Sequence, residues 1–207
     1  MGTIDGARPA VLLNPLEGEP TDADSHIGGP LLWPIDDPWP ACEADGEPFV
    51  GALQLYQRDF PELPFPEGTD VVQVLFCTLD HGAGGPDVRL VWRDSSSVVE
   101  LIEEEPDPSE VEERYVPTIN VFEPIRYAEH PDKVSGGSKI GGWTPWYDTG
   151  PEVFSCPECG SVQVQTLSLA THEPSGDDVE WEFGSEGNLN IFLCSQDVRH
   201  PIKVHVD

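Results

Sequence analysis

Three short blocks of the sequence occur twice, in the same order, about 115 residues apart. The first block reads SHIGGP in one copy and SKIGGW in the other, and the second reads CEADG and CPECG, each followed by a strand-like run. The third reads VVQVLFC and NLNIFLC. The blocks begin at Ser25 and Ser138, at Cys42 and Cys156, and at Val71 and Asn188. Three blocks in one order predict an internal duplication of a single unit.

The runs between turn residues alternate apolar and polar side chains with a period of two. VRLVWR at 88–93 and VEWEF at 179–183 are examples, and this period is typical of half-buried strands. The 20 Gly and 22 Pro leave little room for long helices. We therefore predict an all-β fold, mainly antiparallel, in which a duplicated β unit forms a pseudo-two-fold arrangement.

One short helix is predicted at Asp107–Arg114, between the two copies. Asp107 can cap it, Pro108 suits the first turn, and the acidic residues that follow favour the amino end of a helix dipole.

The domain organisation follows from the repeat and from linker-like composition. Residues 1–24 are expected to form an amino-terminal tail, 25–130 the first β repeat unit and 131–207 the second, packed as one compact protein. The acidic run 103–113 and the SGGS stretch at 135–138 are the expected linker segments.

The net charge restricts the partners. Ten Lys and Arg face 39 Asp and Glu, giving a formal charge of -29, which repels phosphate backbones and anionic lipids. We expect no nucleic acid and no membrane as partner, whereas a basic protein would be steered toward such a surface. A solvated shell adapted to a salty cytoplasm explains the same composition. The amino terminus shows no export signal, and a cytoplasmic location is expected.

The cysteine spacing points to a metal site in the second copy. Five cysteines without an export signal favour thiols or metal ligands over disulfides. In a Cys-x-x-Cys-Gly turn, Cys156 and Cys159 can converge on one tetrahedral ion, and Cys194 at a strand end with His200 would complete the ligands. This set predicts a structural zinc ion.

The first copy carries a weaker candidate set at corresponding places, with an aspartate in place of the second cysteine. Its members are Cys42, Asp45, Cys77 and His81. A carboxylate is an acceptable zinc ligand but a poorer match for a site rich in thiolates.

Two other interpretations of the cysteines stay open. Cys42, Cys77 and Cys194 also fit strand cores, in which unpaired cysteines are often buried. A redox role for Cys156 and Cys159 is less consistent, because thioredoxin-type pairs open a helix and the residues after Gly160 read as a strand.

The succession of GGPLLWP, an apolar strand ending at Gln54–Leu55, and DFPELPFPEG at Asp59–Gly68 resembles the YwqG-like family of uncharacterised bacterial proteins, from about Ser25 onward. This resemblance implies a fold and no catalytic residues. The second half, with CPECG before one strand and FLC after another, is also similar to the programmed cell death protein two family, whose members resemble chaperones for a basic ribosomal protein.

No nucleophile elbow or other catalytic motif is present in the sequence, so we predict no catalytic residues. The hypothesis is a non-catalytic protein-binding module, chaperone-like or toxin-immunity-like, that engages a basic protein through an acidic surface. The alternative is an enzyme or small-molecule binder with its site in the cleft between the two repeats.

Overall fold

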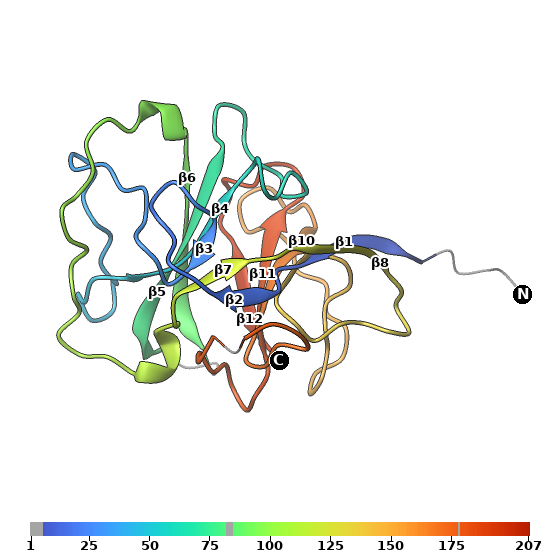
Figure 1. Ribbon diagram of the computed structural model, residues 1–207. Coiled ribbons are helices and arrows are strands. Elements are labelled where there is room, and N and C mark those ends of the chain that lie inside the picture. The colour runs from blue at the N-terminus through green and yellow to red at the C-terminus, as the bar shows by residue number, and fades with distance from the viewer. Residues whose placement is uncertain (1–5, 82–84, 178) are drawn as a thin grey trace, which may run out of the picture.

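The computed structural model describes residues 6–81, 85–177 and 179–207, which form two six-stranded sheets (Figure 1). In chain order the first six strands are β1 (Arg8–Leu12), β2 (Pro15–Glu17), β3 (His26–Ile27), β4 (Val50–Tyr56), β5 (Val71–Asp80) and β6 (Pro86–Arg93). The other six are β7 (Asn120–Phe122), β8 (Ile125–Glu129), β9 (Lys139–Gly141), β10 (Gln163–Ala170), β11 (Asn188–Cys194) and β12 (Lys203–Val206).

The prediction of an antiparallel all-β fold is confirmed. Sheet A has the order β12-β11-β10-β9-β1-β8 and sheet B the order β2-β7-β3-β4-β5-β6, and every pair of neighbouring strands is antiparallel. In the described part of the chain, no helix has the length and apolarity needed to cross a bilayer.

The two sheets repeat one arrangement, because each strand of the first half has its counterpart six strands later. Sheet B and sheet A then have the same order of equivalent strands. Even the irregularities agree: the pairing of β4 with β5 shifts between Gly51 and Leu53, and that of β10 with β11 shifts between Gln165 and Leu167. A bulge at the same place in both sheets is a shared structural feature, since bulges set the local bend of a strand.

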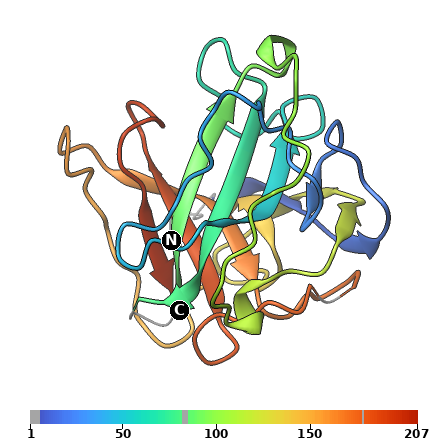
Figure 2. The ribbon, with the colours of Figure 1, turned by 90° about the vertical axis from the view of Figure 1, so that its left-hand side faces the viewer.

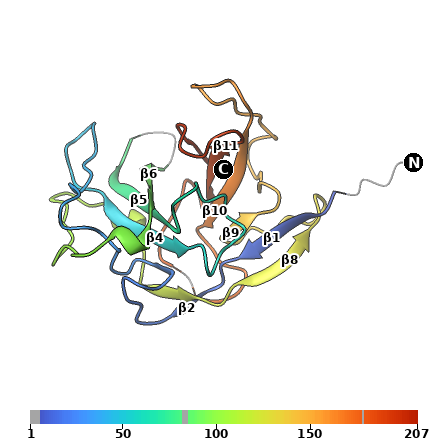
Figure 3. The ribbon, with the colours of Figure 1, turned by 90° about the horizontal axis from the view of Figure 1, so that it is seen from above.

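The first strands of the two halves are exchanged between the sheets. β1 lies in sheet A beside β9 (Figure 3), whereas β7 lies in sheet B beside β3 (Figure 1). The chain passes from β1 in sheet A to β2 in sheet B at Asn14, which takes a left-handed conformation with φ of 50°. The segment expected as an amino-terminal tail thus contains two paired strands, and the expected boundary at residue 130 falls after β8.

The main core lies between the two sheets. Leu53, Leu55 and Val74 of sheet B pack with Leu167 and Ile191 of sheet A in one cluster of buried apolar side chains. Burial of this shared face supplies most of the driving force for folding and holds the two halves together.

The outer face of sheet B is covered by two segments that are far apart in the sequence. The loop 28–49 joins β3 to β4, and the segment 98–119 joins β6 to β7 across the same face (Figure 2). Trp33 and Phe49 from the loop pack on Leu75 and Cys77 of β5 in a second apolar cluster. In sheet A, the loop 142–162 between β9 and β10 holds the corresponding place in the chain.

The prediction of a helix at Asp107–Arg114 is wrong. The described residues contain only two short 3-10 helices, η1 (Ser95–Ser97) and η2 (Glu113–Tyr115), so only the end of the predicted helix is helical at all. The segment is extended because its backbone bonds to other parts of the chain: Ser109 N–H to Glu47 and Glu112 N–H to the carbonyl of Thr78. These non-local bonds outweigh a weak local helix preference among mutually repelling acids.

Candidate metal centres

The Cys-x-x-Cys turn of the second unit is a tight loop whose two sides are bonded to each other. Cys156 N–H donates to the carbonyl of Ser161 at 2.7 Å, and Gly160 N–H donates to the carbonyl of Cys156 at 2.9 Å. Gly160 has a φ of 74°, a conformation that suits glycine and lets the chain reverse after Cys159. The turn thereby presents both sulfurs on its inner side.

The first unit builds the same turn from a different sequence. Cys42 N–H donates to the carbonyl of Glu47 at 2.8 Å, Gly46 N–H donates to the carbonyl of Cys42 at 2.9 Å, and Gly46 has a φ of 83°. Asp45 occupies the place of the second cysteine, and its Oδ1 accepts from Glu47 N–H at 2.8 Å. Since the backbone bonds are the same, the substitution changes the ligand and not the turn.

The remaining candidate ligands come from strand ends and the turns that follow. Cys194 is the last residue of β11 and lies opposite Gln163 at the start of β10, immediately beyond the turn. His200 follows in a turn in which its N–H donates to the carbonyl of Asp197. In the first unit, Cys77 lies near the end of β5 and His81 comes directly after that strand.

In the second unit the four potential ligand atoms lie close together, and two of their separations match those around one tetrahedral ion. Cys159 Sγ is 3.5 Å from Cys194 Sγ, Cys156 Sγ is 3.6 Å from His200 Nδ1, and all four atoms lie within 4.8 Å of one another. Zinc with Zn–S near 2.3 Å and Zn–N near 2.0 Å places its ligand atoms about 3.4 to 3.8 Å apart. We call this group the Cys156 cluster.

The first unit brings its own four candidates together at least as closely. His81 Nε2 lies 3.0 Å from Cys77 Sγ, 3.3 Å from Cys42 Sγ and 3.1 Å from Asp45 Oδ2. Cys77 Sγ lies 3.4 Å from Asp45 Oδ2, and the four atoms again lie within 4.8 Å of one another. This group is the Cys42 cluster. Both clusters could hold a metal such as zinc.

The electrostatics of the two clusters differ. Hydrogen bonds from the Ser161 hydroxyl and N–H lower the pKa of Cys159 to about 6, and the backbone N–H of Asp197 lowers the pKa of Cys194. Burial raises the pKa of Cys77 to about 12. In the Cys156 cluster, burial raises the pKa of Cys156, so its surroundings favour the thiolate at Cys159 and Cys194 and disfavour it at Cys156. In both clusters, a bound cation would stabilise the thiolate of the buried cysteine.

Sequence reasoning missed residues that orient the ligands. Glu158 Oε1 lies 3.4 Å from His200 Nε2, on the side of the ring opposite the nitrogen that faces Cys156. A carboxylate on the second ring nitrogen fixes the tautomer of a metal-binding histidine. The sequence did contain a signal for this role of Glu158. The residue lies inside the Cys-x-x-Cys turn, and that turn must face the other ligands.

A second missed feature is a buried ion pair away from both clusters. Lys139 Nζ lies 2.7 and 2.8 Å from the two carboxylate oxygens of Glu129, and both side chains are fully buried. Glu129 also accepts from Tyr127 Oη, Ser135 N–H and Trp143 N–H. Burial opposes ionisation of Glu129, yet these donors hold its pKa below the ordinary value. All donors are satisfied within the protein, so the pair fixes the start of the loop 142–162.

The alternative interpretations of the cysteines can be compared with this geometry. Four of the five cysteines are buried and Cys159 is exposed, and all five are free thiols. The nearest sulfur partner of Cys159 is Cys194 on another strand, and the turn opens onto the strand β10. This arrangement is unlike the helix-opening pair of a thiol oxidoreductase.

No protein-family model matches the chain, and no curated protein matches it by sequence. The resemblance to the YwqG-like family stays a prediction.

Proposed function

We propose that the protein is a non-catalytic binding module in which each of the two clusters holds one structural zinc ion. The observation that supports this most directly is the repetition of four potential ligand atoms, all within 4.8 Å of one another, at equivalent places in both units. Each cluster offers four protein ligands, which is typical of structural sites, since catalytic zinc sites keep one position open.

Zinc would connect three pieces of chain in each unit. In the second unit these are the Cys156–Cys159 turn at the end of the covering loop, the end of β11 and the turn that carries His200. Without the ion, few backbone hydrogen bonds hold the turn to the end of β11. One of them joins Ser195 N–H to the carbonyl of Val162. In the second unit, the ion would therefore fix the end of the loop 142–162 to sheet A.

The test of the metal proposal is the zinc content of the purified protein. We expect two zinc ions per chain by inductively coupled plasma mass spectrometry, and one in a variant with Cys156→Ser and Cys159→Ser. The matched control is Ser195→Ala, which lies beside Cys194 and is no ligand, and it keeps two. A wild-type protein without stoichiometric zinc after zinc-supplemented purification argues against structural zinc.

The partner proposed for this module is a basic protein, and the distribution of charge supports it. The basic side chains that contact partners within the chain are Arg8, Arg58, Arg89, Arg93, Arg114, Arg126, Lys139, Arg199 and Lys203. Because the sequence has 39 carboxylates and only ten Lys and Arg, the carboxylates far outnumber the cations that could pair with them. The surface potential is strongly negative.

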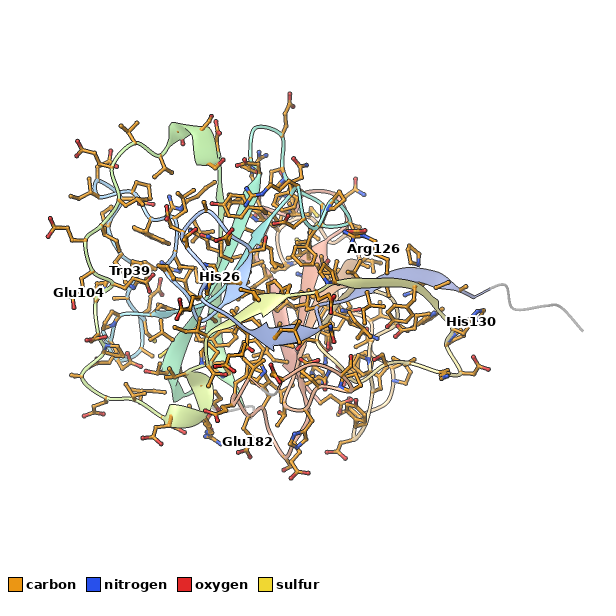
Figure 4. All side chains as sticks on the ribbon, viewed as in Figure 1. His26, Trp39, Glu104, Arg126, His130 and Glu182 are labelled. Atoms are coloured by element: carbon orange, nitrogen blue, oxygen red, sulfur yellow. The ribbon has the colours of Figure 1, made fainter. Side chains whose placement is uncertain are left out.

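One face concentrates exposed acids next to apolar side chains. The exposed carboxylates on the two segments that cover sheet B are Asp36, Glu43, Asp45, Glu100, Glu103, Glu104, Asp107, Glu110 and Glu113. Figure 4 shows Glu104 at the rim of the molecule on the same side as Trp39, which is partly exposed, and Ile35 on that loop is 56% exposed. Carboxylates around apolar contacts suit a basic protein surface, with the charges steering association.

The binding proposal is tested by affinity capture from host cells at low and high salt. Basic proteins should be captured at low salt and lost at high salt. The triple variant Glu103→Gln, Glu104→Gln and Glu110→Gln should capture less than a control with the same charge change on the second unit, Glu152→Gln, Glu182→Gln and Glu186→Gln. Equal capture by both variants would show that the partner does not bind the acidic face over sheet B.

The alternative of a site between the repeats finds limited support. A small hollow lined by residues of both sheets, among them Leu55, Val74 and Ile191, has about 20 Å³, whereas ligand pockets occupy roughly 300 to 1,000 Å³. A surface hollow of about 350 Å³ between the units is lined mainly by apolar residues and contains one acidic residue, Glu62, which pairs with Arg126. No histidine lines it among the described residues.

A further inference from the structure

The two clusters differ in what surrounds them, although their ligands are arranged alike. In the Cys156 cluster, Ser161 bonds to the Cys159 thiol and Asp197 Oδ1 accepts from Arg199 N–H, so these neighbours bond within the cluster region. In the Cys42 cluster, the residues at the equivalent positions are Glu47 and Asp80, and both bond to a separate segment of the chain. This segment is the acidic strap, residues 103–113, in which seven of eleven residues are Asp or Glu.

The acidic strap crosses the outer side of sheet B on the way from η1 to η2 (Figure 1). Its middle is held by Glu47, whose two carboxylate oxygens accept from Ser109 N–H at 2.6 Å and from Ser109 Oγ at 2.5 Å. Glu47 in turn donates its N–H to Asp45 Oδ1 at 2.8 Å. A single bonded path therefore runs from a candidate ligand to the strap.

The end of the strap is held by the run of chain that carries the other two ligands. Thr78 lies between Cys77 and His81. Its hydroxyl donates to the carbonyl of Glu110 at 3.1 Å, and its backbone carbonyl accepts from Glu112 N–H at 2.9 Å. Asp80 N–H donates to Glu112 Oε1 at 2.9 Å. These anchors are within two residues of a candidate ligand.

The strap is also held by Glu105, whose Oε1 accepts from Leu31 N–H at 2.8 Å, and by Glu112, whose Oε2 pairs with Arg114 at 2.7 Å. Seven acids in eleven residues repel one another, which opposes docking of the strap. The bonds to Glu47, Thr78 and Asp80 must offset this repulsion, and they depend on the position of the Cys42 cluster.

The donor sets of the two clusters also differ. The Cys42 cluster has two sulfurs, one imidazole and one carboxylate, whereas the Cys156 cluster has three sulfurs and one imidazole. Zinc favours thiolate over carboxylate in sites of this kind. Exposure does not separate the clusters, because the side chains of His81 and Asp45 are 27% and 20% exposed, while in the Cys156 cluster the side chain of His200 is 20% exposed and Cys159 is exposed. Water and chelators reach both sites, so the donor set is what distinguishes them.

We infer that the Cys42 cluster is an exchangeable zinc site whose occupancy keeps the acidic strap docked on sheet B. This inference rests on the proposed function, in which both clusters bind zinc. Loss of this ion frees Asp45, Cys77 and His81 to move, and the strap anchors at Glu47, Thr78 and Asp80 move with them. The Cys156 cluster retains its ion and has no strap to release.

The experiment is hydrogen exchange of the two-zinc protein during stepwise chelation, with zinc content measured at each step. We expect the first zinc equivalent to leave at low chelator concentration, and exchange of the amides of Ser109 and Glu112 to rise about tenfold or more as it leaves. Amides of the Cys156–Gly160 turn should stay protected until the second equivalent is removed.

Two reciprocal variants separate the sites. Asp45→Cys gives the Cys42 cluster a third thiolate, so about tenfold more chelator should be needed before the strap loses protection. Cys159→Asp weakens the other cluster, and the strap should then stay protected while the second unit loses its ion.

The outcomes distinguish the two proposals. A protein that binds no zinc overturns the proposed function and this inference together. Two zinc ions with strap exchange that is independent of the first equivalent, or a strap that responds to Cys159→Asp and not to Asp45→Cys, overturns the inference alone.

Discussion

Single residues on the outer faces of the sheets show how the two units diverged. His26 on β3 and Lys139 on β9 hold equivalent positions before a Gly-Gly pair, and both are completely buried. Lys139 is neutralised by Glu129. The ring of His26 instead accepts from Gly29 N–H through Nδ1 and bonds to the carbonyl of Pro30 through Nε2. One position thus carries either a buried ion pair or a neutral ring, and each fixes the start of a covering loop.

His26 makes stability depend on pH. Burial lowers the pKa of His26 from 6.5 to about 4, and the neighbouring Asp22 and Asp24 only partly oppose this. Between these values the unfolded chain binds a proton that the folded protein does not, so stability falls as pH falls from 6.5 to 4. At pH 5 the loss from this residue is about 2 kcal/mol.

Urea unfolding at pH 7 and pH 5 measures this loss, with His26→Gln as the comparison. The variant should lose about 2 kcal/mol less than the wild type between the two pH values, although it is less stable at pH 7. Equal losses in the two proteins would show that His26 is not the titrating group.

At the scale of elements, the repeated blocks predicted strands and turns well, and the linkers poorly. The strands around Leu53, Val74 and Ile191 follow from the repeat, and β6 follows from the alternation at 88–93. The strand expected from the alternation at 179–183 is wrong: Val179, Trp181 and Phe183 are buried in the main core, but the segment forms no strand. The two sets of candidate ligands come together because each cysteine is at a fixed distance from a strand end. The extended strap did not follow from the sequence, since its conformation depends on Glu47, more than fifty residues away.

The Glu129–Lys139 pair makes one glycine of the Gly-Gly turn essential. Gly142 has a φ of 71°, and a Cβ there would clash with Glu129 Oε2. Gly142→Ala should therefore cost roughly 3 kcal/mol, combining left-handed strain with displacement of a buried carboxylate.

The matched control is Gly68→Ala, at a φ of 80° with nothing within 4 Å of the added Cβ. It carries the backbone strain alone and should cost about 1 kcal/mol. Chemical denaturation measures both, and equal costs for the two variants would mean that Glu129 yields freely.

The whole molecule is organised by the exchange of strands between its halves. Because β1 completes sheet A and β7 completes sheet B, neither sheet is built from one half alone. The sequence predicted the duplication, and it did not show this exchange, since β1 and β2 lie outside the three repeated blocks. Leu13, at the passage between the sheets, is completely buried in the shared core.

Strand exchange predicts that the two halves unfold together. Calorimetry should give a single transition with equal calorimetric and van't Hoff enthalpies. Leu13→Ala should lower its midpoint while keeping it single, with a cost of about 3 kcal/mol. Two separate transitions in the wild-type protein would show that the sheets are stable independently.

The duplication gives the metal proposal its most direct test, anomalous X-ray scattering at the zinc edge from crystals of the zinc-supplemented protein. We expect two peaks, one among Cys42, Asp45, Cys77 and His81 and one among Cys156, Cys159, Cys194 and His200. Because equivalent strands have the same order in the two sheets, a pseudo-two-fold rotation that relates them should also relate the peaks. A map that lacks the peak at one or both clusters would contradict the proposal that each cluster holds a zinc ion.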